Sequence, residues 1–351
     1  MVWDRRRVAL TAVGAAVVAA LAVGGIAYAM HHGTVGKLAL GPKPAPAHSA
    51  KPPSGPLLSP FTGEPVHRLK RVLIVKIGNT LPERPATGLA RADIVYLIPV
   101  EGGLSRIMAV FSSHYPRVIG PVRSARQDDL QLLRQFGRPA FAWSGAQPQL
   151  VPVVEHSRIV DLYAAKASGY FRTVDRVEPY NLYANTRTLL KQARHASVAR
   201  NIGFRFGPPP PGGHRRRAES VSYPAASFRF RWSPARGRWL IWMDGSPAIS
   251  TGAGQLSAPT VVIQRVVVGL SRFLEQGPMM PPDAETVGSG TATVLRNGQA
   301  FQARWSRPSA NGGTTFTTPS GKPMTFARGP VWIVLAYGPG SSKWRSGKPV
   351  P

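Results

Sequence analysis

Short apolar runs separated by turn residues dominate the first half of the chain, and they predict strands. The runs at 72–77, 93–99 and 106–112 have the length of a buried strand and few polar residues. Two other segments, 125–136 and 186–199, carry apolar residues at the spacing of an amphipathic helix. These elements together predict a mixed α/β domain.

The second half alternates apolar and polar residues at the period of a strand. Phe228, Phe230 and Trp232 alternate with Arg229 and Arg231, which predicts aromatic rings facing a core and arginines facing solvent. Arginine mixed with tryptophan is also typical of nucleic-acid-binding surfaces. Because the domain is predicted to be exported, we expect no nucleic-acid partner.

Turn residues divide this second half into hairpins. A turn at 234–237 is followed by a return strand at 239–243. Asn297-Gly298 is a strong signal for a two-residue hairpin, and Ser320-Gly321 predicts a further turn. We therefore predict a mostly β domain, a small sandwich or barrel, over 223–340, and an α+β fold class for the whole chain.

The amino end has the pattern of a membrane anchor or a signal peptide. Val8–Ala29 contains 22 residues without a charge and follows Arg5–Arg7, and a helix of that length spans about 33 Å. The arginines favour a cytoplasmic amino end and an extracytoplasmic remainder, which is a single-pass protein of the cell membrane. Ala27-Tyr28-Ala29 also fits a signal-peptidase site, and cleavage after Ala29 would give a secreted protein.

Composition shifts divide the chain into six predicted parts. In order, these are a membrane anchor or signal peptide (1–30), a tether rich in Pro and Ala (31–59), the amino-terminal α/β domain (60–206), a Pro/Gly/Arg linker (207–222), the carboxy-terminal β domain (223–340) and a tail (341–351).

Charge and residue usage exclude several function classes. The chain has 44 Lys and Arg against 16 Asp and Glu, a net charge of +28, and it has no cysteine. Disulfides, thiol nucleophiles and cysteine-ligated metals are therefore excluded. The eight histidines are scattered, and the H-E-x-x-H, G-x-S-x-G and P-loop motifs are missing. We expect no metal and no cofactor.

The segment Gly120–Asp129 predicts an anion-binding site between a strand and a helix. Ser124 with Gln127 has capping-box spacing, so Ser124 is the predicted N-cap. Arg123 and Arg126 flank a helix end that carries partial positive charge and free N–H groups. This combination suits a phosphate or carboxylate. The alternative is that both arginines form internal ion pairs with Asp128, Asp129 or Glu101.

A second polar turn contains Glu101 and Arg106, separated by Gly102-Gly103. If the flanking strands are neighbours, this turn lies at the same sheet end as Arg123 and Arg126. Glu101, with Asp93, is then a candidate catalytic residue; the alternative is a plain hairpin with solvated charges.

A third polar loop contains Tyr180 and Asn181, which are able to hydrogen-bond a sugar or acyl group. The alternative is a plain turn before the helix at 186. With Arg106, Arg123, Ser124 and Arg126, these two residues complete the candidate ligand-binding set.

Several motifs together resemble the YerB lipoprotein family. They are Pro60-Phe61-Thr62-Gly63, Arg84–Leu89, Ala92–Tyr96, Glu101-Gly102-Gly103 with Arg106, Gly120–Arg126, and more weakly Gly288–Gly290 and Gly329–Trp332. The resemblance covers about 60–205 and, less closely, 223–340. It implies an exported, envelope-attached protein with two domains, and it implies no reaction.

Three departures from the family pattern bear on function. The chain lacks the lipidated cysteine, so the apolar helix is expected to replace the lipid. Tyr180 stands where a histidine is frequent, which removes any histidine role there. Leu97 stands where an acid is frequent, which weakens a mechanism with two carboxylates.

Three functions from different classes follow. The first is a membrane-tethered extracytoplasmic envelope protein that binds an anionic wall polymer or a muropeptide through the arginine-lined helix end. The second is an enzyme, a transferase or hydrolase acting on lipid-linked or phosphorylated cell-wall precursors. The third is an envelope scaffold with protein partners that the sequence does not identify.

Overall fold

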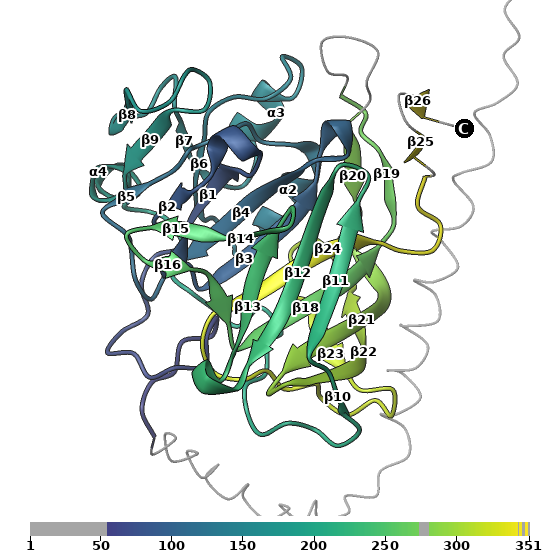
Figure 1. The fold of residues 1–351 in the computed structure, drawn as a ribbon. Helices are drawn as coiled ribbons and strands as arrows, with labels where there is room; N and C mark the ends of the chain where they lie inside the picture. Colours follow the sequence, from purple (N-terminus) through teal and green to yellow (C-terminus); the bar gives the residue numbers. More distant parts are fainter. Residues whose placement is uncertain (1–54, 274–280, 343, 346–347, 350–351) are drawn as a thin grey trace, which may run out of the picture. The chain divides into compact units, whose positions relative to one another are not determined.

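A central sheet of eleven strands organises the computed structural model, which describes residues 55–273, 281–342, 344–345 and 348–349 (Figure 1). Its strands, in spatial order, are β10 (His214–Arg215), β22 (Gln299–Arg307), β21 (Gly288–Arg296), β18 (Thr260–Val266), β24 (Val331–Tyr337), β3 (Ile94–Pro99), β4 (Ser105–Phe111), β1 (Leu73–Gly78), β6 (Ala140–Trp143) and β7 (Val160–Tyr163), with β23 (Thr315–Thr317) beside β22.

Both predicted domains contribute to this sheet. Strands β24 and β3 pair in parallel at its centre, with Val331 opposite Ile94 and Val334 opposite Leu97. The predicted linker also holds strands, since β10 pairs with β22 and β11 (Ala218–Tyr223) pairs with β12 (Ala226–Ser233). Backbone hydrogen bonds therefore join the two halves of the chain edge to edge.

Both faces of the central sheet are buried, which explains the nearly continuous apolar runs of its strands. On one face, Val95, Val261 and Val334 belong to a core that includes Phe228 and Trp239 of a smaller sheet. This five-stranded sheet consists of β11, β12, β13 (Arg238–Met243), β14 (Ser246–Pro247) and β17 (Ser257–Ala258). Figure 1 shows β11, β12 and β13 in front of the central strands.

Three short α-helices occur among the described residues. They are α2 (Gln127–Arg134), α3 (Val151–Glu155) and α4 (Thr186–Gln192). The first two cover the opposite face of the central sheet, where Leu132, Leu133 and Val154 pack with Tyr96 and Val110. Leu189 of α4 packs on the face of the five-stranded sheet.

Short strands and 3₁₀ turns complete the fold. The remaining strands are β16 (Gly254–Gln255), β15 (Ile249–Thr251) and β2 (Ala86–Thr87) in one sheet, β5 (Val118–Ile119), β9 (Leu182–Asn185) and β8 (Tyr170–Arg172) in another, and the pairs β19 (Val268–Leu270) with β20 (Pro282–Ala284) and β25 (Trp344–Arg345) with β26 (Lys348–Pro349). The 3₁₀ turns are η1 (Leu81–Glu83), η2 (Leu89–Arg91), η3 (Glu101–Gly103) and η4 (Pro234–Arg236).

The strand predictions are confirmed and the helix predictions are too long. The hairpin at Asn297-Gly298 forms between β21 and β22, with positive φ at both turn residues. The predicted helix at 186–199 ends at Gln192, since Ala193 leaves the helical conformation with φ −102° and ψ 46°. Farther on, the backbone N–H of Ala199 donates to Lys70 O instead of to a helical carbonyl. The fold is mostly β, and the mixed α/β content predicted for the amino-terminal domain is wrong.

The predicted membrane span, Val8–Ala29, lies outside the described residues. Within the described ranges, no helix has the length and apolar character needed to cross a membrane.

A cut in the loop at 208–213 is expected to leave the two halves of the chain associated. Pairing of β24 with β3 and of β15 with β2 holds them together without the covalent link. A protease site inserted between Pro210 and Pro211 makes the cut specific. After cleavage, the protein should show two bands on a denaturing gel and one species on size-exclusion chromatography. Two native species would show that the shared sheet needs the chain connection.

Candidate functional site

Charged side chains from three loops gather at one end of the central sheet. Arg106, at the start of β4, lies opposite Gly78 of β1 on one side and Ile98 of β3 on the other. Strands β1 and β3 both run antiparallel to β4, so their carboxyl ends reach the same sheet edge. The segment before α2 joins them there, because Arg123 N–H donates to Lys76 O at 2.9 Å.

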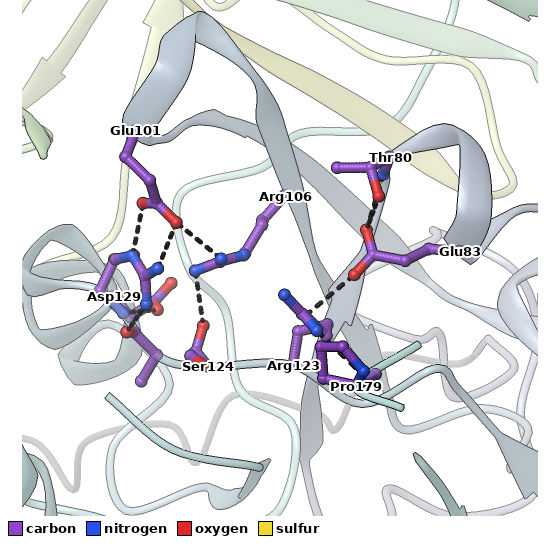
Figure 2. Close-up of polar contacts among 10 residues, drawn as sticks. Thr80, Glu83, Glu101, Arg106, Arg123, Ser124, Asp129 and Pro179 are labelled. Carbon is purple, nitrogen blue, oxygen red and sulfur yellow. Dashed lines mark hydrogen bonds and ion pairs between the residues drawn. The ribbon is translucent and has the colours of Figure 1, made fainter. Parts of the chain in front are cut away.

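Glu101 holds two arginines at this edge (Figure 2). Its Oε1 lies 2.7 Å from Nη2 of Arg106, and its Oε2 accepts a 2.7 Å hydrogen bond from Nε of Arg126. Arg126 Nη2 forms a second, shorter bond to Oε1, so the contact with Arg126 is bidentate. All three side chains are at most 17% exposed. We refer to Glu101, Arg106 and Arg126 as the charge triad.

Arg123 forms a second ion pair beside the triad (Figure 2). Its Nε lies 2.9 Å from Oε1 of Glu83, a fully buried side chain whose other oxygen accepts from Thr80 N–H and Oγ1. The guanidinium also lies over the Tyr180 ring, 5.5 Å from its centroid. A Cβ at Gly78 would stand 2.2 Å from the Glu83 carboxyl, so any larger residue at position 78 would clash with that carboxyl.

The arginines outnumber the carboxylates in this cluster by three to two. Burial alone would raise the pKa of Glu101, but the hydrogen bonds from Arg126 and the charges of Arg106 and Arg126 lower it to about 2. Burial, with the nearby positive charge of Arg126, lowers the pKa of Arg106 to about 10. Net positive charge therefore remains at the sheet edge.

The helix α2 starts later than predicted. Its N-cap is Arg126 rather than Ser124, because the Asp129 carboxylate accepts a 2.7 Å hydrogen bond from Arg126 N–H. The other Asp129 oxygen pairs with Nζ of the buried Lys76 at 2.6 Å. Ser124 remains in the extended segment and offers only its carbonyl oxygen, 3.5 Å from Nη1 of Arg106. The predicted Ser124 cap is therefore wrong.

The other predicted residues divide between this cluster and distant places. Tyr180 reaches the cluster through its contact with Arg123. Asn181 is used inside its own hairpin, where it accepts from Arg172 and donates to Thr173 O. Asp93 precedes β3 whereas Glu101 follows it, and eight residues at about 3.3 Å each separate them by roughly 26 Å.

A hollow of about 680 Å³ opens beside the cluster. Thr80 and Tyr180, which contact Glu83 and Arg123, line it together with Leu104. The opposite wall is the turn between β11 and β12, where Ala225 N–H donates to Gly103 O at 2.9 Å. The hollow therefore lies between parts of both predicted domains.

Sequence reasoning missed Glu83 and the pair of Lys76 with Asp129. Thr80 and Glu83 have capping-box spacing, and that signal was available at η1. Lys76 sits in the middle of an apolar strand, where a charge requires a buried partner. Among the described residues, no three His, Asp or Glu side chains gather in a way that would hold a metal ion.

Replacing Glu101 with Gln is expected to destabilise the fold by about 2–4 kcal/mol, because it leaves two buried arginines without their counter-charge. Chemical denaturation measures this loss. Glu178→Gln is the matched control, since Glu178 and its partner Arg172 are 66% and 43% exposed and such pairs contribute little. Equal effects of the two substitutions would contradict the role of burial in the charge triad.

Asp93 is expected to make stability fall as pH rises. Burial raises the pKa of Asp93 to about 6, although Ser113 and Ser112 donate backbone hydrogen bonds to its carboxylate. The folded state thus holds the proton more tightly than the unfolded chain, and its advantage is lost as pH rises through about 6. Between pH 4.5 and 7.5 this loss is about 2 kcal/mol.

The variant Asp93→Asn isolates this contribution, because Asn keeps an acceptor oxygen and does not titrate. The unfolding free energy of wild type minus that of the variant should fall by about 2 kcal/mol as pH rises from 4.5 to 7.5. Urea titration at each pH measures both values. A difference that stays constant would contradict the raised pKa of Asp93.

The comparison with known proteins agrees with the mostly β fold. The crystal structure of YerB protein from Bacillus subtilis superposes with a TM-score of 0.69 at 20% identity, covering 80% of this chain and 96% of that one. The sequence is 37% identical over 111 residues to the protein named "Putative lipoprotein YerB" of Bacillus subtilis (strain 168). That alignment spans 31% of this chain and 33% of the relative.

Two family descriptions match most of the folded part. Residues 61–199 match the N-terminal domain of the protein family of unknown function DUF3048, and residues 219–333 match its C-terminal domain. The first match contains β1, β3, β4, β6 and β7 of the central sheet, and the second contains β18, β21 and β22. The chain therefore belongs to the DUF3048 family, to which the YerB-like resemblance of its motifs had pointed.

Proposed function

We propose that this chain is an exported, membrane-attached envelope protein that binds an anionic wall component in the hollow beside the charge triad. The relative named as a lipoprotein supports the attachment and the extracytoplasmic place. The uncharged run Val8–Ala29 after Arg5–Arg7 supports an anchor of a different kind, since the chain has no cysteine to carry a lipid.

The observation that carries the binding role is the excess of arginine at the sheet edge. Three guanidinium groups share two carboxylates, which leaves a local charge of 3 − 2 = +1 behind the wall that Thr80 and Tyr180 form. Asp244, the charged residue in the lining of the hollow, is paired with Arg84 at 2.8 Å. Arg123 is 16% exposed and Tyr180 lines the hollow. A bound phosphate or carboxylate would balance the excess through charge-assisted hydrogen bonds.

The same geometry argues for binding rather than catalysis. A general base works best with a pKa near the working pH, whereas the pKa of Glu101 is about 2 because two arginines stabilise its charged form. Asp93 lies roughly 26 Å away at the other end of β3, at about 3.3 Å per residue. The two candidate catalytic acids therefore have no shared substrate position.

A pair of variants tests the site by the direction of its effects. Glu83→Gln removes one negative charge and releases Arg123, so it should tighten binding. The double variant Arg123→Gln/Glu83→Gln keeps the original net charge but lacks the guanidinium, and it should bind about tenfold more weakly than wild type. Isothermal titration with soluble muropeptides, released from purified cell wall by muramidase, measures both.

Arg172→Gln is the matched control, because Arg172 is an exposed arginine paired with Glu178 outside the hollow. It should leave the affinity unchanged, and melting temperatures should establish that all variants are folded. Equal affinity of wild type, Glu83→Gln and the double variant would overturn the proposal.

A further inference from the structure

A second hollow, of about 780 Å³, lies at the other end of β12. Ala226 at the start of β12 lines the hollow beside the charge triad, and Arg231 and Trp232 near its end line this one. Five residues at about 3.3 Å each separate Ala226 and Arg231 by roughly 17 Å. We call the second hollow the arginine trough; its charged and aromatic lining consists of Arg215, Arg216, Arg217, Arg229, Arg231 and Trp232.

Main-chain hydrogen bonds fix the three consecutive arginines of the trough. Arg215 pairs with Gln299 of β22, and Arg216 N–H donates to Gly298 O at 2.8 Å. On the other side, Trp232 N–H donates to Arg217 O at 2.9 Å. The segment thus bridges the central sheet and the five-stranded sheet, and its arginines are held on a rigid backbone.

The other two arginines project from the outer face of β12. Phe228 and Phe230 fill the core, so the alternation of the strand places Arg229 and Arg231 outside. Arg231 lies over the ring of Trp242, 5.4 Å from its centroid. Trp242 stands on the outer face of β13, so the inward position predicted for the aromatic rings of the preceding strand does not extend to it.

The charge of the trough is almost uncompensated. Among the described residues, Arg216 alone of the five arginines has an acidic partner, Glu219 at 3.3 Å. Five arginines and one glutamate leave a local charge of 5 − 1 = +4. Packing like charges together is unfavourable, and the fold uses none of these guanidinium groups to satisfy a buried carboxylate. Charge complementarity therefore calls for an external anion with several charges.

We propose that the arginine trough binds a linear polyanion, a polymer carrying a phosphate or carboxylate on each repeat. Arg229 and Arg231 are two residues apart on one face, a spacing of about 6.6 Å that lets neighbouring charges of one polymer be gripped together. Trp232, on the inward face of β12 and half-buried against the core, adds an apolar surface to the lining beside them. This surface is separate from the proposed muropeptide site and does not depend on it.

Long-chain polyphosphate is the probe, with inorganic phosphate as its monovalent counterpart. Wild-type protein should bind polyphosphate with an affinity that falls steeply with salt, because several contacts release counterions together. Arg229→Gln/Arg231→Gln should weaken binding at least tenfold. Inorganic phosphate at the same total phosphate concentration should fail to compete. Fluorescence anisotropy with labelled polyphosphate measures these quantities.

The control variant removes the same charge elsewhere. Arg265→Gln/Arg304→Gln changes two exposed arginines of β18 and β22 that do not line the trough. It should retain wild-type affinity within about twofold. An equal loss in both variants would overturn the proposal, because it would reduce the effect to net charge.

Two further measurements distinguish polyanion binding in the trough from membrane binding and from binding at the first hollow. Vesicles containing phosphatidylglycerol should bind wild type and Arg229→Gln/Arg231→Gln equally. If the trough arginines were needed for binding to vesicles and polyphosphate did not bind, the trough would be a membrane-binding surface and the polyanion proposal would be overturned. Arg123→Gln/Glu83→Gln should bind polyphosphate normally. A loss there would place polymer binding at the Arg123–Glu83 pair beside the first hollow instead.

Discussion

The parallel pairing of β24 with β3 is the interaction on which the rest of the structure depends. It joins strands separated by more than two hundred residues and sets the register of Val331 against Ile94. The Tyr223 hydroxyl lies 2.8 Å from Leu335 O and 3.1 Å from Leu97 O, so the five-stranded sheet is fastened at the same junction. The turn that follows Tyr223 forms one wall of the hollow beside the charge triad. A shift in the register of β24 against β3 would therefore move this turn away from the rest of the lining of the hollow.

Buried charge is the second constraint, and it is costly. Lys76 with Asp129 and Arg123 with Glu83 lie in a protein interior where apolar residues of similar volume are often at least as stabilising. Glu101 between two arginines adds a third such group. These contacts occur together at one sheet edge. Their cost is easier to understand if they position Arg106 and Arg123 for a ligand than if they serve stability alone.

Local patterns made much of the fold predictable. The apolar runs that became β1, β3 and β4, and the Asn297-Gly298 turn, depend on neighbours in sequence. Helix lengths were not predictable from spacing, because the Asp129 side chain caps the backbone at Arg126 and so delays the start of α2, and because the Ala199 N–H bonds to the distant Lys70 O instead of a helical carbonyl. The pairing of β24 with β3 was also beyond reach, since no local signal specifies which distant strand completes a sheet.

The candidate site was predictable to the extent that strand order follows from hairpins. Glu101, Arg106, Arg123 and Arg126 come together because β1 and β3 flank β4. Asp93 was grouped with them only by its position near the same strand, and strand length alone puts it at the opposite end. The spacing of Thr80 and Glu83 signals a capped turn, but it does not reveal that the Glu83 carboxyl packs against Gly78 and pairs with Arg123, which is why Glu83 was missed.

The positions of the acidic residues in the fold show where the net charge of +28 is exposed. Composition alone says little about partners, because an excess of arginine spread over a surface has no preferred ligand. In this fold Glu83, Asp93, Asp128 and Asp129 are buried, so a quarter of the 16 acidic residues cannot screen the surface. The exposed arginines on β12 and at 215–217 thus have few acids to pair with. Burying these acids inside the fold and leaving the arginines of β12 and 215–217 exposed are two consequences of the same distribution of charge.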